Sequence, residues 1–352
     1  MRRLRVLLAG LTLALCAACS GSTGSTAASP PPGTTEDAPS PLASPSTSPS
    51  ASPSASPSSA SPSARATHSS PSATPSPRAT TITPREAAFP DARTTGPRIS
   101  LKADNPGNLS IRREGMVIKG RNITGSLDIY ANNVTIIDSK ITSTNWWGVN
   151  LRPGYHGLRI LHSTITAVPG KGPDNGGVDY AVSNMGNSSI EIGWCDISVF
   201  GNALSMGQGN IHDNYVHDLV PFRNEGGEWQ HTDAVISGGD SSGSLVIRHN
   251  TLLNPVAVDQ GASAAIGLFA DTGHVSNTVV DSNLLAGGAY ALYGGGDGAT
   301  GIVVTNNVFS TRYHGNSGVY GAVTAWNAAG SGNVWRGNRF SDGTALTPRP
   351  AD

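Results

Sequence analysis

Short segments of one pattern recur along the chain from about residue 134 onward, and this repetition restricts the fold more than any other feature. In each segment a Ser, Cys or Asn is followed two residues later by an aliphatic or aromatic residue. The first position is held by Ser139, Ser163, Cys195, Asn214, Asn250, Asn283, Asn307 and Asn338, and the second by Ile141, Ile165, Ile197, Val216, Leu252, Leu285, Phe309 and Phe340. A period of about 20 to 35 residues, with short strands and Gly or Asn turns, predicts a parallel β-solenoid of about nine coils.

The Asn column has a physical cause. Each coil must turn sharply there, and we expect Asn to adopt the left-handed conformation that such a turn requires. Stacked side-chain amides can also satisfy one another and the buried backbone from coil to coil. His162 and His249, which lie directly before this column, are interpreted as structural.

A second column of Ala lies later in each coil, at Ala181, Ala203, Ala234, Ala265, Ala291 and Ala322. If the residues after them point inward, the Ala residues form a bare outer strip on which an extended ligand could lie. The alternative is that Ala marks a cramped corner. The pattern favours neither.

The beginning of the chain is typical of an export signal. Residues 1–19 have a basic start, an apolar stretch too short to span a bilayer and a small-residue exit. Ala17, Ala18 and Cys19 resemble the end of a bacterial lipoprotein signal, which implies lipidation of Cys19 and a location on the outer face of the cell membrane. Cys16 departs from that pattern, so cleavage and secretion without a lipid are left open.

The remaining boundaries follow from composition. Residues 20–96 are rich in Ser, Pro, Ala and Thr and predict a disordered linker, residues 97–346 hold the repeats, and residues 347–352 form a tail. Cys195 is then the one Cys of the repeat domain and is expected to be buried and inert. A formal net charge of -1 gives no sign of nucleic-acid binding. The only membrane contact expected is the lipid anchor, and a monomer is expected.

Four further motifs carry a resemblance. The chain has "HTDAVI" from His231, "IRHNT" from Ile247, "SNLLAGGAYALYGG" from Ser282 and "VTNNVF" from Val304. These resemble motifs of an uncharacterised actinobacterial secreted group within the right-handed parallel β-helix superfamily that includes pectate-lyase-like proteins. The resemblance implies an all-β, right-handed parallel β-helix. Ala234 replaces a Gly and Ile236 replaces a Gln of that group's pattern.

Candidate site residues gather around one strand. Alignment on the Ala column places Asp233 between Asn202 and Ala264, with Tyr290 further along the same column. His231, two residues before Asp233, could place an imidazole beside the carboxylate and exchange a proton with it. The resemblance retains this pair, and we predict that it handles protons. The alternative is a structural hydrogen bond that ties down a loop.

Other candidates come from loops and neighbouring coils. Glu228 and Asp179 are further catalytic candidates, although Asp179 is one residue out of register with Asp233. The side chains expected to bind or stack on sugar are Asn202, Arg223, Trp229, Tyr290, Tyr293 and Arg312. The acidic side chains could hold Ca²⁺, but no ordered calcium motif is present, so the metal is unknown.

These observations predict an exported protein that cleaves an extracellular polysaccharide or cell-wall glycan on one face of the solenoid. Elimination needs a base and a cation for the uronate, whereas hydrolysis needs two carboxyl groups, and the residues do not separate the two. The alternative is a surface protein that binds carbohydrate or adheres without catalysis, because this fold hosts many activities.

Overall fold

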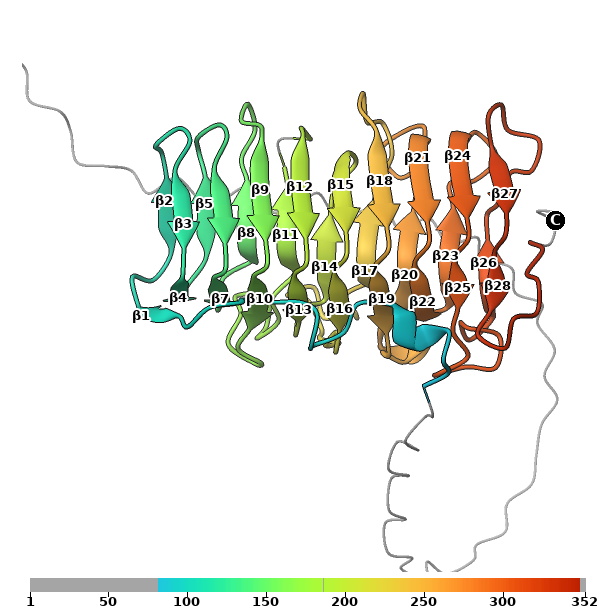
Figure 1. Cartoon of the computed structure of the whole chain (residues 1–352), viewed down its shortest axis with the longest axis horizontal. Helices are drawn as coiled ribbons and strands as arrows, with labels where there is room; N and C mark the ends of the chain where they lie inside the picture. The colour runs from blue at the N-terminus through green and yellow to red at the C-terminus, as the bar shows by residue number, and fades with distance from the viewer. Residues whose placement is uncertain (1–81, 186, 349–352) are drawn as a thin grey trace, which may run out of the picture. The chain divides into compact units, whose positions relative to one another are not determined.

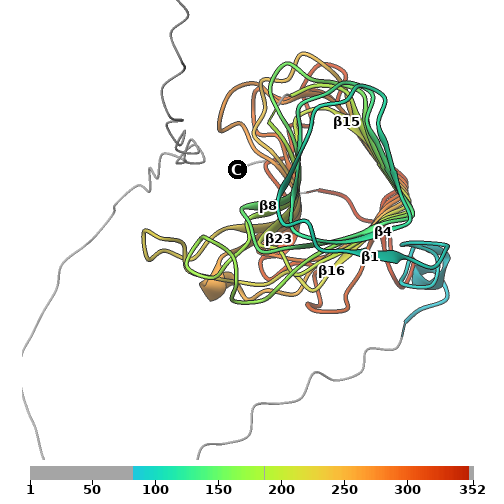
Figure 2. The same ribbon diagram turned by 90° about the vertical axis from the view of Figure 1, so that its left-hand side faces the viewer.

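The chain winds into a parallel solenoid in which each complete coil adds one strand to each of three sheets. The computed structural model describes residues 82–185 and 187–348, and it confirms the right-handed parallel β-helix (Figures 1 and 2). We name the sheets A, B and C in the order in which the chain visits them. Within the described residues no helix is long and apolar enough to cross a membrane.

All strands are short and pair in parallel with the equivalent strand of the next coil. Sheet A consists of β1 (Lys102–Asp104), β4 (Arg121–Thr124), β7 (Lys140–Ser143), β10 (Thr164–Ala167), β13 (Asp196–Ser198), β16 (Tyr215–His217), β19 (Thr251–Asn254), β22 (Leu284–Gly287), β25 (Val308–Phe309) and β28 (Arg339–Phe340). Sheet B consists of β2 (Leu109–Ile111), β5 (Leu127–Ile129), β8 (Trp147–Leu151), β11 (Tyr180–Asn184), β14 (Asn202–Ser205), β17 (Thr232–Ser237), β20 (Ala262–Leu268), β23 (Tyr290–Gly294) and β26 (Gly321–Thr324). Sheet C consists of β3 (Val117–Lys119), β6 (Thr135–Ile137), β9 (Leu158–Leu161), β12 (Ile190–Gly193), β15 (Gly209–His212), β18 (Leu245–Arg248), β21 (Ser276–Asp281), β24 (Thr300–Thr305) and β27 (Val334–Arg336).

The Asn column forms a buried amide ladder at the turn from sheet C to sheet A. Asn214 Nδ2 donates to Asn250 Oδ1 at 2.9 Å, and Asn250 Nδ2 donates to Asn283 Oδ1 at 2.9 Å. Asn283 and Asn307 continue the ladder to Asn338. Each amide also reaches a backbone carbonyl of the coil before, as when Asn250 Nδ2 donates to Ile211 O at 3.0 Å. The expected stacking of amides is therefore confirmed.

The expected conformation of these Asn residues is wrong. The left-handed residue is the one before each ladder position, with φ between 44° and 58° at Asp138, His162, Trp194, Asp213, His249, Ser282 and Asn306. This residue makes the sharp turn and projects outward, which leaves the ladder Asn free to point into the core. The rings of His162 and Trp194 stack at 4.8 Å, and His249 Nδ1 lies 2.6 Å from Asp213 Oδ1. Both His residues are thus part of the turn, as expected.

The Ala column marks a cramped corner and not an outer wall. All six Ala residues belong to the hydrophobic core, and so do the Val, Leu and Ile residues that follow the first five of them. Gly148 holds the equivalent position on β8, where an added Cβ would lie 2.7 Å from Ile165 Cγ2. Only a small residue fits at this corner, because sheets A and B converge there. Of the two alternatives left open by the sequence, the cramped corner is confirmed and the bare outer strip is wrong.

The segment before β1 runs back along the solenoid from its last coil to its first coils (Figure 1). We call residues 82–100 the strap; it includes the 3-10 helix η1 (Glu86–Ala88). Its contacts, in chain order, are Glu86 with Ser310 and Ser341, Pro90 O with Thr251, Gly96 N with Trp194 O, and Arg98 with Asp138. Residues 82–96 were expected in the linker, but these contacts place them on the solenoid.

Candidate functional site

Two columns of side chains face outward from sheet B. The strand pairing confirms the first, because Asn202 pairs with Asp233, Asp233 with Ala264, and Ala264 with Tyr290. Tyr180 precedes Asn202 in this column. The second column lies three residues later on each strand and includes Tyr293 on β23. Asp233, Asn202, Tyr290 and Tyr293 therefore share one face, as expected.

Asp233 is buried on this face without a charge partner. Its side chain is 0% exposed, and neither carboxyl oxygen has a hydrogen-bond partner of normal geometry. Burial raises the pKa of Asp233 well above its usual range, an effect that the backbone N–H of Ala264 only partly offsets. Burial therefore favours the uncharged form of the Asp233 carboxyl group.

The ring of Phe269 covers Asp233. A Cβ added to Gly267 would lie 2.2 Å from that ring and 3.1 Å from Asp233 Oδ1. The ring and the carboxyl group therefore both lie directly beside Gly267. Glycine at this position lets the ring lie against the sheet. Phe269 itself is half-buried at the end of β20.

Asp179 and Asp174 form an acidic pair beside sheet B. Both are buried. Burial, followed by the charge and the carboxyl group of Asp174, raises the pKa of Asp179 to about 7. Asp179 Oδ2 has no hydrogen-bond partner. Asp179 therefore keeps a proton up to about pH 7, and one of its oxygens is left for a ligand.

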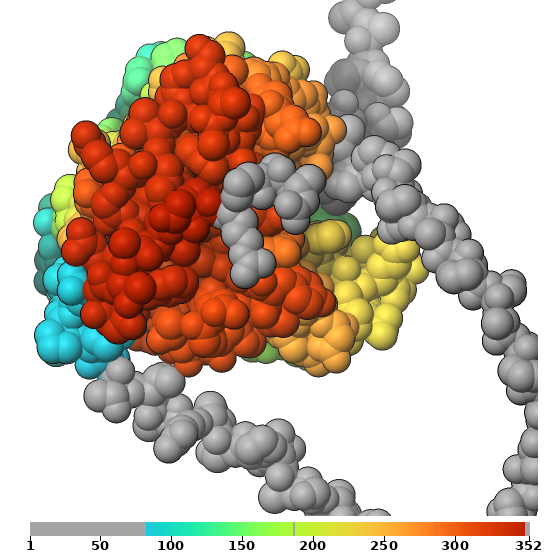
Figure 3. All heavy atoms as spheres, turned by 90° about the vertical axis from the view of Figure 1, so that its right-hand side faces the viewer, coloured from blue at the N-terminus to red at the C-terminus, as the bar shows by residue number. Residues whose placement is uncertain are grey.

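Loops between sheets A and B hold this pair in place. The β10–β11 loop bends back on itself through a bridge between Asp174 and Gly177, and Asp174 Oδ1 accepts the backbone N–H of Glu225 at 2.7 Å. The ring of Phe222 packs against Gly177 and Gly201 and occupies the space that a side chain at either position would need. The β10–β11 and β16–β17 loops therefore support one another and project beside sheet B (Figures 2 and 3).

Aromatic side chains continue along sheet B beyond the acids. The ring centroids of Phe269 and Tyr293 lie 5.0 Å apart, those of Tyr293 and Tyr290 lie 5.6 Å apart, and those of Tyr290 and Tyr320 lie 5.9 Å apart. Tyr320 is 63% exposed. We call Phe269, Tyr293, Tyr290 and Tyr320 the aromatic strip. It can offer ring faces to a flat ligand on the later coils.

The structure does not bring His231 and Asp233 into contact. His231 is exposed, and its Nδ1 lies 2.9 Å from Ser263 Oγ. The charge that raises the pKa of Asp233 further is that of Asp271. The predicted pairing of His231 with Asp233, for proton transfer or as a structural hydrogen bond, is therefore wrong, because residues two apart at the start of this strand do not direct their side chains to the same place.

The polar loop before β17 is a hairpin with its own internal contacts. Arg223 lies over the Trp229 ring at 4.6 Å from its centroid and donates to Gly227 O at 2.8 Å. Glu228 is exposed, and its backbone N–H donates to Asn224. The raised pKa values of Asp179 and Asp233 reflect burial and the charges of Asp174 and Asp271, and Glu228 does not contribute to them. The three predicted site residues of this loop thus lie beside the buried acids and do not join them.

Arg312 lies away from sheet B. It is in the loop after β25, where its backbone N–H donates to Ser310 Oγ and its charge lowers the pKa of Glu86 in the strap. The charge of Arg312 also acts to lower the pKa values of Tyr215, in sheet A, and of Tyr313, which burial raises. The expectation that Arg312 binds sugar beside Tyr290 is not supported by this placement.

No metal site forms among residues 82–185 and 187–348, where no three His, Cys, Asp or Glu side chains gather closely enough to hold an ion. The Ca²⁺ site considered from the sequence therefore lacks a ligand set in this part of the chain. Cys19, the predicted lipid attachment site, lies outside the described residues. Cys195 is buried in the core, and burial raises the pKa of its thiol to about 12.

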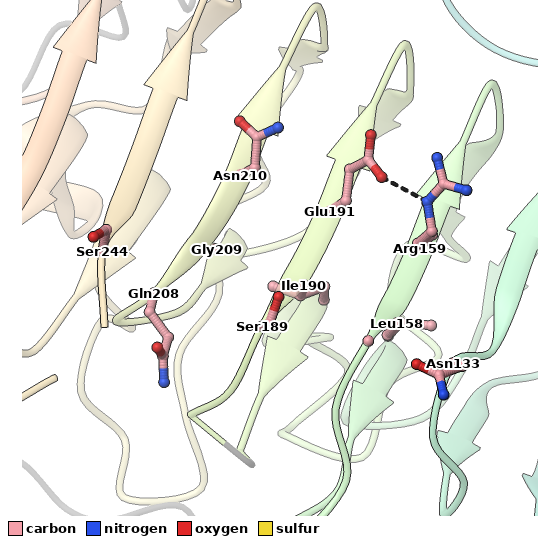
Figure 4. Close-up of a pocket in the computed structure, with 11 residues that line it drawn as sticks. Asn133, Leu158, Arg159, Ser189, Ile190, Glu191, Gln208, Gly209, Asn210 and Ser244 are labelled. Carbon is pink, nitrogen blue, oxygen red and sulfur yellow. Dashed lines mark hydrogen bonds and ion pairs between the residues drawn. The ribbon is translucent and has the colours of Figure 1, made fainter. Parts of the chain in front are cut away.

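A shallow groove of about 650 Å³ lies on the outer face of sheet C (Figure 4). It is lined by residues such as Asn133, Ser189, Gln208 and Asn210, together with the ion pair of Arg159 Nε and Glu191 Oε2 at 2.6 Å. Its charged groups neutralise one another, and it holds none of the predicted site residues. Sheet B, and not this groove, carries the candidate site.

Comparison with known proteins finds no family model, no curated protein and no solved structure that matches the chain. The resemblance to pectate-lyase-like proteins stays a prediction, and the site must be judged from its own residues.

Sequence reasoning missed the strongest feature of the site. Asp174 was not selected, because the contact between Asp174 and Asp179 depends on how a Gly-rich loop folds. The signal was the spacing "DNGGVD", in which two acids flank a turn. Phe269 was also missed, because it follows β20 and lies outside both outward columns.

The raised pKa values have a measurable consequence for stability. Between the unfolded and folded pKa values the folded state binds more protons, so its free energy of unfolding falls as pH rises, from about pH 4 to about pH 7 for Asp179. We expect a lower thermal midpoint at pH 7.5 than at pH 4.5.

Asp233→Asn should raise the midpoint at pH 7.5, whereas Asp297→Asn, at an exposed loop position, should not. An unchanged midpoint in the Asp233 variant would show that this carboxyl is already ionised.

Proposed function

We propose that this protein hydrolyses an extracellular glycan on the outer face of sheet B, with Asp179 as the general acid. The observation that carries the proposal is the buried pair of Asp174 and Asp179, which keeps a proton on Asp179 up to about pH 7. Cleavage of a glycosidic bond requires a carboxylic acid that remains protonated near the working pH, because the leaving oxygen must receive a proton.

Asp233 is the candidate for the second carboxyl group. It lies two coils beyond Asp179, which corresponds to about 10 Å along the sheet. That separation is near the upper end of the range for inverting glycosidases, in which a water lies between acid and base. Asp233 would have to ionise to activate that water, and this requires that Phe269 move aside and admit solvent. Hydrolysis then breaks the bond between the anomeric carbon and the leaving oxygen, which takes the proton of Asp179.

Hydrolysis is better supported than elimination. The tyrosines of this face are poor bases, because burial, together with the charges of nearby acids, raises the pKa of Tyr180 and of Tyr293 to about 12. A lyase would also need a cation for the uronate, and the strand positions around Asp233 hold none. Binding without cleavage remains the competing function, which the aromatic strip alone could perform.

The test is to incubate the full chain with a panel of extracellular glycans and follow two signals. New reducing ends without absorbance from unsaturated uronides would support hydrolysis, whereas that absorbance would indicate elimination. A glycan that is bound but not cut would leave only the binding function. If none is bound, the proposal fails.

We also propose that the protein is exported and held at the cell surface through Cys19, on the strength of its signal-like first residues. In cells, Cys19→Ser should move the protein from the membrane fraction into the medium. A protein that stays with the membrane after this substitution would contradict the lipid anchor.

A further inference from the structure

The outward columns of sheet B carry no basic side chain from β11 to β26. The first column holds Tyr180, Asn202, Asp233, Ala264, Tyr290 and Gly321. The second holds Ser183, Ser205, Ile236, Gly267, Tyr293 and Thr324. Protein sites that bind carboxylate polymers pair them with Arg or Lys, which form charge-assisted hydrogen bonds. This face provides no such partner.

Two arginines near this face are already engaged. Arg152, at the end of β8, pairs with Asp128 at 3.5 Å and lies against the rings of Trp147 and Tyr130. Arg223 lies on Trp229 and donates to its own hairpin. The other charged groups around them include Asp174 beside Asp179, Asp271 acting on Asp233, and the exposed Lys171 of the β10–β11 loop. A polyanion would meet repulsion along this face.

Several buried polar atoms beside this face lack a partner. Asn150 Oδ1 and Asn202 Oδ1 are acceptors, whereas Asp179 Oδ2 and the carboxyl oxygens of Asp233 accept or, where they carry the proton, donate. The remaining two are donors, the Trp147 indole N–H, which faces Asp128, and Arg152 Nε. Buried acceptors without a partner cost free energy, and a ligand that donates hydrogen bonds would recover it. Sugar hydroxyls are such donors, whereas carboxylates are acceptors only.

We propose that the polymer bound along sheet B is an uncharged glycan, recognised through its hydroxyl groups and apolar ring faces, and not a uronate. This inference rests on the proposed function and specifies its substrate class. The hydroxyls donate to the acceptors of the middle coils, once the covering side chains open. The ring faces lie on the aromatic strip of the later coils, which suits neutral sugar rings.

Matched polymers test the charge dependence. The full chain is titrated with hydroxyethyl cellulose and carboxymethyl cellulose, and with methyl-esterified polygalacturonan and free polygalacturonate. We expect at least one uncharged polymer to bind about tenfold or more tightly than its charged counterpart, and Tyr290→Ala to weaken that binding. Tighter binding of a charged polymer, lost in Tyr290→Ala, would overturn the substrate class but leave the glycan site intact. Absence of binding, or binding that Tyr290→Ala leaves unchanged, would reject the site itself.

A gain of binding provides the second test. Ser205 is half-exposed on β14 in the second outward column. Ser205→Arg should increase affinity for carboxymethyl cellulose roughly fivefold, because it supplies the missing cation, and Ser205→Gln should not. Equal affinities in the two variants would show that the lack of a cation is not what excludes anionic glycans, and the inference would be withdrawn.

Discussion

Asp179→Asn is expected to lower the rate of glycan hydrolysis by roughly 10² to 10⁴-fold, the usual contribution of a general acid. The amide keeps the size of the side chain but cannot deliver a proton to the leaving oxygen. Initial rates of reducing-end formation measure the effect. Asp259→Asn, at an exposed position in the β19–β20 loop, is the matched control and should retain the full rate.

The pH profile gives an independent view of the same group. Because the pKa of Asp179 is about 7, the hydrolysis rate should fall as pH rises through that value, when the acid loses its proton. The residual hydrolysis rate of Asp179→Asn should not show this fall at alkaline pH. Removal of a carboxyl group with a raised pKa should also leave the thermal midpoint at neutral pH unchanged or higher. A full rate in the variant, or an unchanged alkaline limb, would contradict the assigned role.

Asn250→Ala is expected to destabilise the solenoid by on the order of 3 to 5 kcal/mol, because it removes the centre of the buried ladder. Asn250 Oδ1 accepts from the backbone N–H and the side chain of Asn214, and its Nδ2 donates to Ile211 O, Arg248 O and Asn283 Oδ1. All of these groups would lose a partner where water cannot replace it. The thermal midpoint, read by circular dichroism, should fall accordingly.

Asn210→Ala is the control for this substitution. Asn210 lies on β15 with its side chain exposed on sheet C, so its loss should change stability by no more than about 0.5 kcal/mol. If the two variants unfolded at the same temperature, the ladder would contribute no more than an ordinary surface residue.

The fold could be predicted because its determinants are periodic. The residue two places after each ladder position pairs with its equivalent on the next coil, as Ile165 does with Ile197 and Leu252 with Leu285. An apolar residue repeated in every coil reports burial directly, since each coil depends on its neighbours for a core. Alignment on the Ala column placed Asp233 beside Asn202 in the correct register.

Side-chain direction and loop structure could not be predicted in this way. Alternation along an ideal strand would turn Ala234 outward, but the corner between sheets A and B places it in the core together with Val235. The contact between Asp174 and Asp179 arises inside a loop that has no repeat to align. The strap could not be predicted from composition, because residues 82–96 are still rich in Ala, Thr and Pro and are held only by contacts with distant coils.

The strap also determines how the molecule would respond to a pull. Glu86 contacts Ser310 and Ser341 of the last coils, and Leu346 hydrogen-bonds to Asn338 there, so the described chain begins and ends at the same end of the solenoid. Tension applied through the segment before residue 82 would load the Glu86 contacts first, then those of Pro90, Gly96 and Arg98 in turn. The contacts of the strap would therefore break one after another along the solenoid. The coils themselves would carry no load until the strap had detached as far as Lys102.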